Sequence, residues 1–152
     1  METAASGGRL WAARAALVAK RRAGLSWDDI AAALGRSVVW STSAVLGQQP
    51  LDPSQAESLG GLLELAPEVV DALCEPPVRG AAAVDRTEPV VYRLEEAIQV
   101  YGSAVAELVR ERFGDGIMSA IDFELDMERR ADPKGDRVVL TFSGKFLPYR
   151  VW

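Results

Sequence analysis

The chain has 152 residues, of which 49% are apolar, and it carries a net charge of −5. This length suits one domain or two small ones, and the acidic balance disfavours general electrostatic binding to nucleic acids or anionic membranes. The sequence contains no histidine, which excludes histidine-dependent catalytic triads, histidine general bases and histidine-ligated zinc. A single cysteine, Cys74, excludes an intrachain disulfide and a cysteine-cluster metal site.

No stretch reaches the roughly 18 consecutive apolar residues that a membrane span needs, because charges interrupt each apolar run. The basic cluster near the N-terminus follows the apolar stretch, whereas a signal peptide has the opposite order. We therefore expect a cytoplasmic protein without a membrane partner.

The first half of the chain, from about residue 9 to residue 73, predicts a series of short helices. Apolar residues at helical spacing predict a first helix that ends at Gly24. Residues 26–29, with the sequence SWDD, have the form of a capping box and begin a second helix that ends at Gly35.

A third and a fourth helix are predicted from their capping residues. Ser37 can cap a helix that runs to Leu46. Asp52, followed by proline at the first helical position, can cap a helix over residues 53–65.

The second and third helices have the shape of a helix-turn-helix, so DNA binding is an alternative function. Recognition helices normally offer Arg, Lys, Asn or Gln to the DNA, but residues 26–46 contain one basic residue, Arg36, against Asp28 and Asp29. A bundle used for packing explains the segment better, and we expect no nucleic-acid partner. The residues expected to be exposed on the third helix are Trp40, Ser41, Thr42 and Ser43.

A domain boundary is predicted where the helical periodicity stops, between residues 75 and 89. Prolines and Gly80 in this stretch are typical of a linker. We predict a helical bundle domain over residues 1–80, a linker over 81–88 and a second domain over 89–152.

The second domain is predicted to begin with a long helix from Pro89 that ends at Gly114. Residues 121–128 alternate between apolar and acidic side chains, which predicts a strand with one buried face. A turn at 131–137 leads to a second strand over 138–142 that ends at Ser143-Gly144. The apolar stripe of the helix consists of Val91, Leu94, Ile98, Val105, Leu108 and Val109.

The four carboxylates of the first strand do not predict a metal site. Alternate residues of a strand stand about 7 Å apart, so these groups do not converge on one ion. One helix and one hairpin also bury little apolar surface, and the strand edges need covering. We therefore predict an obligate oligomer. The carboxylates are Asp122, Glu124, Asp126 and Glu128.

Three motifs of the second half, in this order, resemble the catalytic domain of the cyanases. They are YRLEEAIQVYG at 92–102, FGDGIMSAIDFELD at 113–126 and GKFLPY at 144–149. Weaker similarity to the helical N-terminal domain of the family continues upstream, at 45–65 and 76–80.

The resemblance implies an α+β fold with two parts. The first is an N-terminal helical bundle similar to repressor-type DNA-binding domains, and the second is a C-terminal helix and β-hairpin that interlock in a dimer. It further implies a homodecamer built from dimers, with active sites formed between subunits.

The activity that the resemblance implies is the bicarbonate-dependent conversion of cyanate to carbamate and carbon dioxide. Carbamate then gives ammonia and a second carbon dioxide. Cyanate and bicarbonate are the small-molecule partners, bicarbonate being a co-substrate, and no metal or organic cofactor is implied.

The catalytic residues of the family are an arginine and a glutamate three residues apart on the helix, with a serine from a glycine-containing loop. The flanking Tyr-Arg and Tyr-Gly pairs place them here at Arg93, Glu96 and Ser119. The implied substrate contacts come from Arg93, Ser119, Ala120 and Leu147.

The chemistry of these groups suggests separate roles. Arg93 offers permanent charge and planar paired donors to the anions. Glu96 lies on the same helix face and either orients Arg93 or transfers a proton. Ser119 donates hydrogen bonds and does not act as a nucleophile, because the chain has no histidine to activate it. The residues between Arg93 and Glu96 are Leu94 and Glu95, whereas the family usually has an aromatic side chain at one or both of these positions.

Two other functions fit parts of the sequence. One is a helix-turn-helix regulator whose C-terminal half senses a small anion and dimerises. The other is a catalytically inactive relative retained as an oligomeric scaffold, which the presence of Arg93, Glu96 and Ser119 disfavours.

Overall fold

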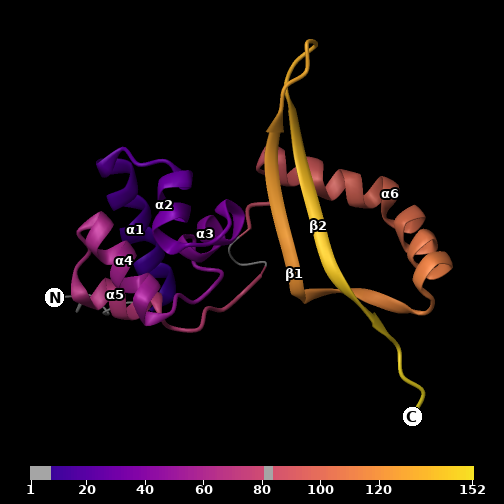
Figure 1. Ribbon diagram of the computed structural model, residues 1–152, viewed down its shortest axis with the longest axis horizontal. Helices are drawn as coiled ribbons and strands as arrows, with labels where there is room; N and C mark the ends of the chain where they lie inside the picture. The colour runs from indigo at the N-terminus through magenta and orange to yellow at the C-terminus, as the bar shows by residue number, and fades with distance from the viewer. Residues whose placement is uncertain (1–7, 81–83) are drawn as a thin grey trace. The chain divides into compact units, whose positions relative to one another are not determined.

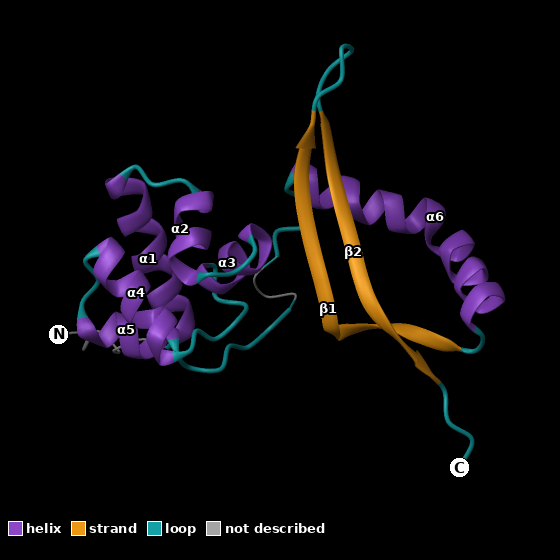
Figure 2. Cartoon of the chain, in the orientation of Figure 1, coloured by secondary structure: helices purple, strands orange, loops and turns teal. Residues whose placement is uncertain are grey.

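The computed structural model describes residues 8–80 and 84–152 (Figure 1). The chain divides into two compact units, one of residues 1–80 with 126–139 and one of residues 81–125 with 140–152. Within the described residues there are six helices and a two-stranded sheet, which confirms the predicted α+β class (Figure 2). The predicted linker at 81–88 begins with residues outside the described part, and the predicted domain boundaries remain predictions.

Five short helices occupy the N-terminal half. Their bounds are α1 (Arg9–Ala23), α2 (Trp27–Leu34), α3 (Val38–Val45), α4 (Pro53–Leu63) and α5 (Pro67–Leu73). Helices α3 and α4 end before the predicted residues 46 and 65, respectively. In α4 the cause is Glu64, whose left-handed backbone (φ 53°) breaks the helix. The fifth helix had no separate prediction.

The predicted helix ends follow local capping chemistry. Gly24 and Gly35 both adopt the left-handed conformation that ends a helix. The capping box of α2 is present, because Ser26 Oγ accepts from the Asp29 amide while the Asp29 carboxylate accepts from the Ser26 amide. Asp52 caps α4 in the same reciprocal way.

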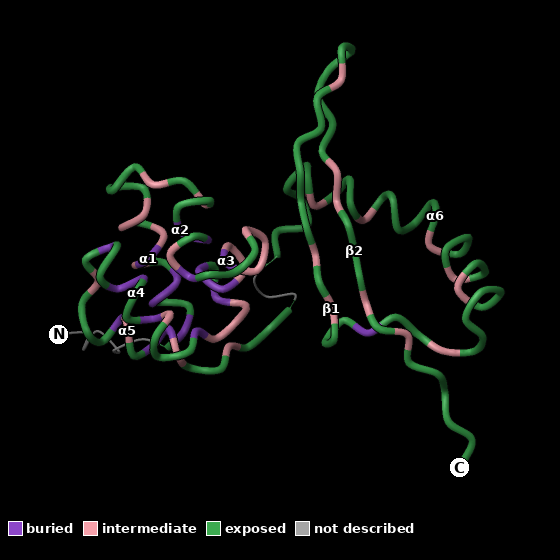
Figure 3. The backbone as a smooth tube through the Cα atoms, in the orientation of Figure 1, coloured by how far each residue is buried: buried purple, intermediate pink, exposed green. Residues whose placement is uncertain are grey.

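The apolar core of the described chain lies among these five helices, where the buried residues gather (Figure 3). It runs from Ala12 in α1 to Leu73 in α5. Arg9 is buried beside this core, and its guanidinium donates to the carbonyls of Ala44 and Gln49. Burial lowers the pKa of Arg9 from its usual value because the charged form is desolvated.

The third helix does not expose the side chains that a DNA-reading helix would need. Ser41, predicted to be exposed, is fully buried, and Trp40 packs partly buried against the core. Thr42 is half-buried and its hydroxyl donates to the Val38 carbonyl of its own helix. The prediction of exposure was wrong for Ser41 because it lies three and four residues before Ala44 and Val45, so it shares the helix face that these two residues bury in the core.

The C-terminal half consists of α6 (Pro89–Phe113), β1 (Gly116–Arg130) and β2 (Arg137–Pro148). Both predicted ends of the helix are correct, with Pro89 in its first turn and Gly114 after its last residue. No residue of α6 is buried, and its stripe residue Ile98 is 71% exposed. In the part of the chain that the structure describes, no helix is long and apolar enough to cross a membrane.

Both strands are longer than predicted. β1 begins at Gly116, so the segment predicted to be a loop before residue 121 is paired strand. β2 continues through Ser143-Gly144 to Pro148. Gly144 does not end the strand. It lets the two backbones approach, because a Cβ there would stand 2.5 Å from the Ser119 carbonyl oxygen.

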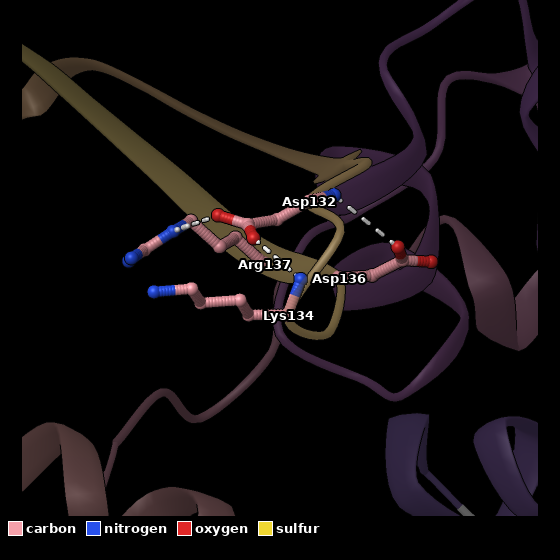
Figure 4. Close-up of polar contacts among 4 residues, drawn as sticks. All are labelled: Asp132, Lys134, Asp136 and Arg137. Atoms are coloured by element: carbon pink, nitrogen blue, oxygen red, sulfur yellow. Dashed lines mark hydrogen bonds and ion pairs between the residues drawn. The ribbon is translucent and has the colours of Figure 1, made fainter.

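The turn between the strands is held by the carboxylates of its own residues (Figure 4). Asp132 accepts from the Lys134 amide at 2.8 Å and pairs with Arg137 at 3.3 Å. Gly135 has a φ of 121°, a conformation that favours glycine. The predicted turn is thereby confirmed except at Arg137, which is the first residue of β2.

Candidate active site

Arg93 and Glu96 lie one helical turn apart on α6 and form a direct ion pair. Arg93 Nη1 is 2.9 Å from Glu96 Oε2, and the two side chains are 70% and 53% exposed. The Arg93 guanidinium carbon also lies 5.4 Å from the centre of the Tyr92 ring. An exposed pair of this kind contributes only about 0 to 1 kcal/mol to stability. The pair therefore adds little to stability, and its effect is to direct the Arg93 guanidinium toward Glu96.

The neighbouring carboxylate, Glu95, has a different partner. Its Oε1 lies 3.4 Å from Nε of Arg86, which precedes the helix. Adjacent helical residues point about 100° apart, so Glu95 and Glu96 face different surroundings. The structure thus leaves Glu96 as the carboxylate that holds Arg93.

Ser119 lies in β1 and not in a loop as predicted. It is 5% exposed and is the buried position of this strand. Its Oγ accepts hydrogen bonds from the amides of Ile121 and Asp122, each at 3.0 Å. The prediction failed because glycines in a strand resemble those of a loop, and here they permit close strand pairing.

The pairing of β1 with β2 is irregular near Ser119. Met118 lies against Gly144, and the Phe123 and Phe142 rings lie 5.9 Å apart. Between these two contacts β1 advances five residues (118 to 123) while β2 advances two (144 to 142). β1 therefore carries extra residues here, as in a β-bulge, and it bends sharply near its start (Figure 1).

The two further predicted contact residues lie on the exposed surface of the hairpin. Ala120 is exposed, and Leu147 is 40% exposed. The backbone of Leu147 lies close to Gly116, where a Cβ would meet the Leu147 carbonyl oxygen and would stand 2.5 Å from the Phe146 ring. Phe146 in turn lies 5.4 Å from Phe113 at the end of α6, measured between ring centres.

The structure brings together one part of the predicted catalytic set. Arg93 and Glu96 are paired, but no hydrogen bond or ion pair within the described residues joins Ser119 to either of them. Two surface hollows lie in the helical half, one between α4 and α5 and one on α1, and neither is lined by a predicted site residue. Residues 8–80 and 84–152 also contain no group of three or more Cys, Asp or Glu residues arranged to hold a metal ion.

The sequence did not predict two sets of contacts, one at Ser119 and one at Glu95. The backbone amides of Ile121 and Asp122 bind the Ser119 hydroxyl, and backbone groups leave no signature in residue identity. The Arg86–Glu95 pair was also missed, because Arg86 lies in a segment whose conformation the sequence pattern does not predict.

Comparison with known families matches both halves of the chain. Residues 9–77 match the family described as "Cyanate hydratase, N-terminal". Residues 83–151 match the "Cyanate lyase C-terminal domain".

Individual relatives are similar over nearly their whole length. A cyanate hydratase from Thiobacillus denitrificans is 50% identical over 138 residues, covering 90% of this chain and 93% of the relative. One from Mycolicibacterium vanbaalenii is 52% identical over 135 residues, covering 88% of each.

A solved structure shares the fold. The crystal structure of cyanase from T. urticae has a TM-score of 0.81 and 36% sequence identity, covering 90% of this chain and 96% of that one. The expected family is therefore confirmed, and the chain belongs to the cyanate hydratase (cyanase) family of enzymes.

Proposed function

We propose that the protein decomposes cyanate in a bicarbonate-dependent reaction, with Arg93, Glu96 and Ser119 as its catalytic residues. The observation that carries this proposal is the oriented Arg93–Glu96 pair on α6 in a chain of this family. The hydroxyl of the buried Ser119 supplies a second, uncharged hydrogen-bond donor.

The reaction must overcome repulsion between two monoanions. An oxygen of bicarbonate forms a bond to the carbon of cyanate, which gives a dianionic adduct. The proton of bicarbonate moves to nitrogen, a second proton is taken up there, and the bond between the bridging oxygen and the bicarbonate carbon breaks. Carbon dioxide leaves, the electron pair stays on oxygen, and carbamate remains. Carbamate takes up a further proton and releases ammonia and a second carbon dioxide.

Arg93 supplies the positive charge that this adduct requires. Its planar guanidinium offers paired donors to carboxylate-like oxygens, and such donors act most strongly where charge develops in the transition state. Glu96 keeps the guanidinium in one orientation. A carboxylate near two anions is unfavourable unless it is paired with arginine or protonated, and both states suit a group that orients Arg93 or delivers the proton.

We further propose that the site is completed in an oligomer, a homodecamer built from interlocked dimers. Support comes from α6, in which no residue is buried although Leu94, Ile98, Val105 and Leu108 form an apolar stripe. A second copy that covers this stripe would also place further residues near Arg93. Native mass measurement tests this proposal, and a stable monomer that retains activity contradicts it.

The proposed reaction needs no metal or organic cofactor, because bicarbonate is the co-substrate and Arg93 provides the charge. Treatment with a chelator should therefore leave the rate of ammonia release unchanged. We also propose a cytoplasmic location, since a chain with one cysteine suits a reducing compartment.

The decisive experiment measures ammonia released from cyanate with and without bicarbonate. We expect release above the spontaneous rate only when bicarbonate is present, and its loss in Arg93→Ala. Arg110→Ala is the matched control, because Arg110 forms the same kind of ion pair, with Glu107 at 2.6 Å, near the other end of α6. A rate indifferent to both bicarbonate and Arg93→Ala would refute the proposed function.

A further inference from the structure

The hydrogen bonds of Ser119 restrict what its hydroxyl can do. A serine hydroxyl has one O–H donor and two acceptor lone pairs. Both acceptor positions are used by the amides of Ile121 and Asp122, each 3.0 Å from Oγ. The only hydrogen-bonding group that remains is the single O–H donor, which must point away from these two amides.

This arrangement is not what a regular strand provides. Successive amides of a strand point to opposite sides of the chain, so two consecutive amides directed at one oxygen require a local break in the ladder. The extra residues of β1 between its contacts with Gly144 and Phe142 supply that break. The bulge is therefore what brings both amides to Ser119.

Two amide donors also change the strength of the remaining donor. Hydrogen bonds in a chain polarise one another, so a hydroxyl that accepts from two N–H groups donates its own proton more strongly. The effect is larger where water is excluded, and Ser119 is 5% exposed. A polarised O–H with a fixed direction suits a small anion.

We propose that the backbone amides of Ile121 and Asp122 are positioning groups that hold Ser119 as a one-directional hydrogen-bond donor to an anionic oxygen of the reacting species. This inference rests on the proposed function, because it takes Ser119 as a member of the site. It assigns the bulge of β1 to the active site and makes Ser119 a donor alone.

Proline substitution tests the proposal because it removes an amide N–H. Ile121→Pro and Asp122→Pro each delete one donor to Ser119, while Ile121→Ala and Asp122→Ala keep the donor and serve as matched controls. The Ile121 side chain is 98% exposed, so its truncation alone removes few contacts within the chain.

We expect each proline variant to lower kcat at least about tenfold relative to its alanine control, since small misplacements of catalytic groups are costly. The KM for cyanate should change much less, because the donor acts mainly on the charge that develops in the transition state. Thermal unfolding and native mass should match those of the alanine control. Equal kcat values for correctly folded proline and alanine variants would overturn the inference.

Hydrogen exchange provides a second test that does not depend on activity or on the proline variants folding. In Ser119→Ala the amides of Ile121 and Asp122 lose their acceptor, so their exchange should accelerate at least about fivefold. The Val91 amide is the internal control, because it donates to the Glu88 side chain at 3.0 Å on α6. Unchanged exchange at both β1 amides contradicts the positioning role.

The two measurements separate this inference from the proposed function. If the unsubstituted protein releases no ammonia from cyanate, the proposed function fails, and the exchange rates still decide whether the amides hold Ser119. If the unsubstituted protein is active but the proline and alanine variants are equally fast, the positioning inference alone fails.

Discussion

On α6 the guanidinium of Arg93 donates to the carboxylate of Glu96 across 2.9 Å, and both groups remain exposed. Such a pair contributes little to the stability of a helix. It does restrict a long side chain that would otherwise sample many rotamers. The pair therefore presents a guanidinium in a defined orientation before any substrate binds.

Replacing this guanidinium by an ammonium group tests the importance of its shape. Arg93→Lys keeps the charge but loses the planar pair of donors, and we expect kcat/KM for cyanate to fall about 100-fold. Arg110→Lys, in the other i,i+3 pair of α6, should have no comparable effect. Steady-state ammonia release measures both variants, and equal rates for Arg93→Lys and unsubstituted protein would contradict the assignment.

Gly144→Ala tests the close approach of the two strands at Ser119. A Cβ at this position would stand 2.5 Å from the Ser119 carbonyl oxygen, so the backbone of β1 has to move. We expect destabilisation by about 1 to 3 kcal/mol, as for other overpacked sites, together with reduced activity. Ser143→Ala, at the exposed neighbouring position, is the control. Unfolding in urea and ammonia release provide the two measurements.

Two adjacent glycines of α4 should respond to alanine in opposite ways. A Cβ at Gly60 would stand 2.5 Å from Cγ2 of Val70, whereas a Cβ at Gly61 meets nothing within 4 Å. Gly61→Ala should stabilise the protein by about 0.5 to 1 kcal/mol through helix propensity. Gly60→Ala should destabilise it by about 1 to 3 kcal/mol. Tryptophan fluorescence during urea unfolding measures both, and shifts of the same sign would contradict the packing of α4 on α5.

The capping box of α2 predicts a pH dependence of stability. Hydrogen bonds from the Ser26 hydroxyl and amide hold the pKa of Asp29 below its usual 3.8. A carboxyl whose pKa is lowered by folding contributes stability above its unfolded pKa and loses it as the pH falls through the folded value. Asp29→Asn should therefore destabilise the protein at neutral pH, and the difference from the unsubstituted protein should vanish below the folded pKa.

Urea unfolding at several pH values between neutral and about 2.5 measures this difference, over the range in which the carboxyl titrates. Asp28→Asn is the control, because it removes a charge from the same helical turn without removing the bonds to Ser26. A penalty for Asp29→Asn that stays constant across the whole range would contradict the role of the carboxylate.

Much of the helical architecture could be predicted because its signals are local. Ser26 with Asp29, Asp52 with Pro53, and Gly24 and Gly35 act within one turn of the residues that they cap. The ends of α6 were predicted on the same basis.

The hairpin was predicted less well because its extent depends on contacts between distant residues. The residues next to Gly144 in the sequence suggest the end of a strand. Gly144 instead permits the close approach of Ser119, which lies on the other strand. Burial of Arg9 was also not predicted, because its partners are carbonyls more than thirty residues away. Arg93 and Glu96 were placed by motif, and their contact followed from helical spacing.

The apolar core cluster described above is formed entirely by residues between Ala12 and Leu73. During synthesis, these residues are translated before any part of α6 or the hairpin. Because domains generally fold as units and the N-terminal one folds first, the bundle can reach its packed state while the chain is still growing. A nascent chain would thus carry a folded N-terminal bundle before the hairpin, which contains Ser119, is complete.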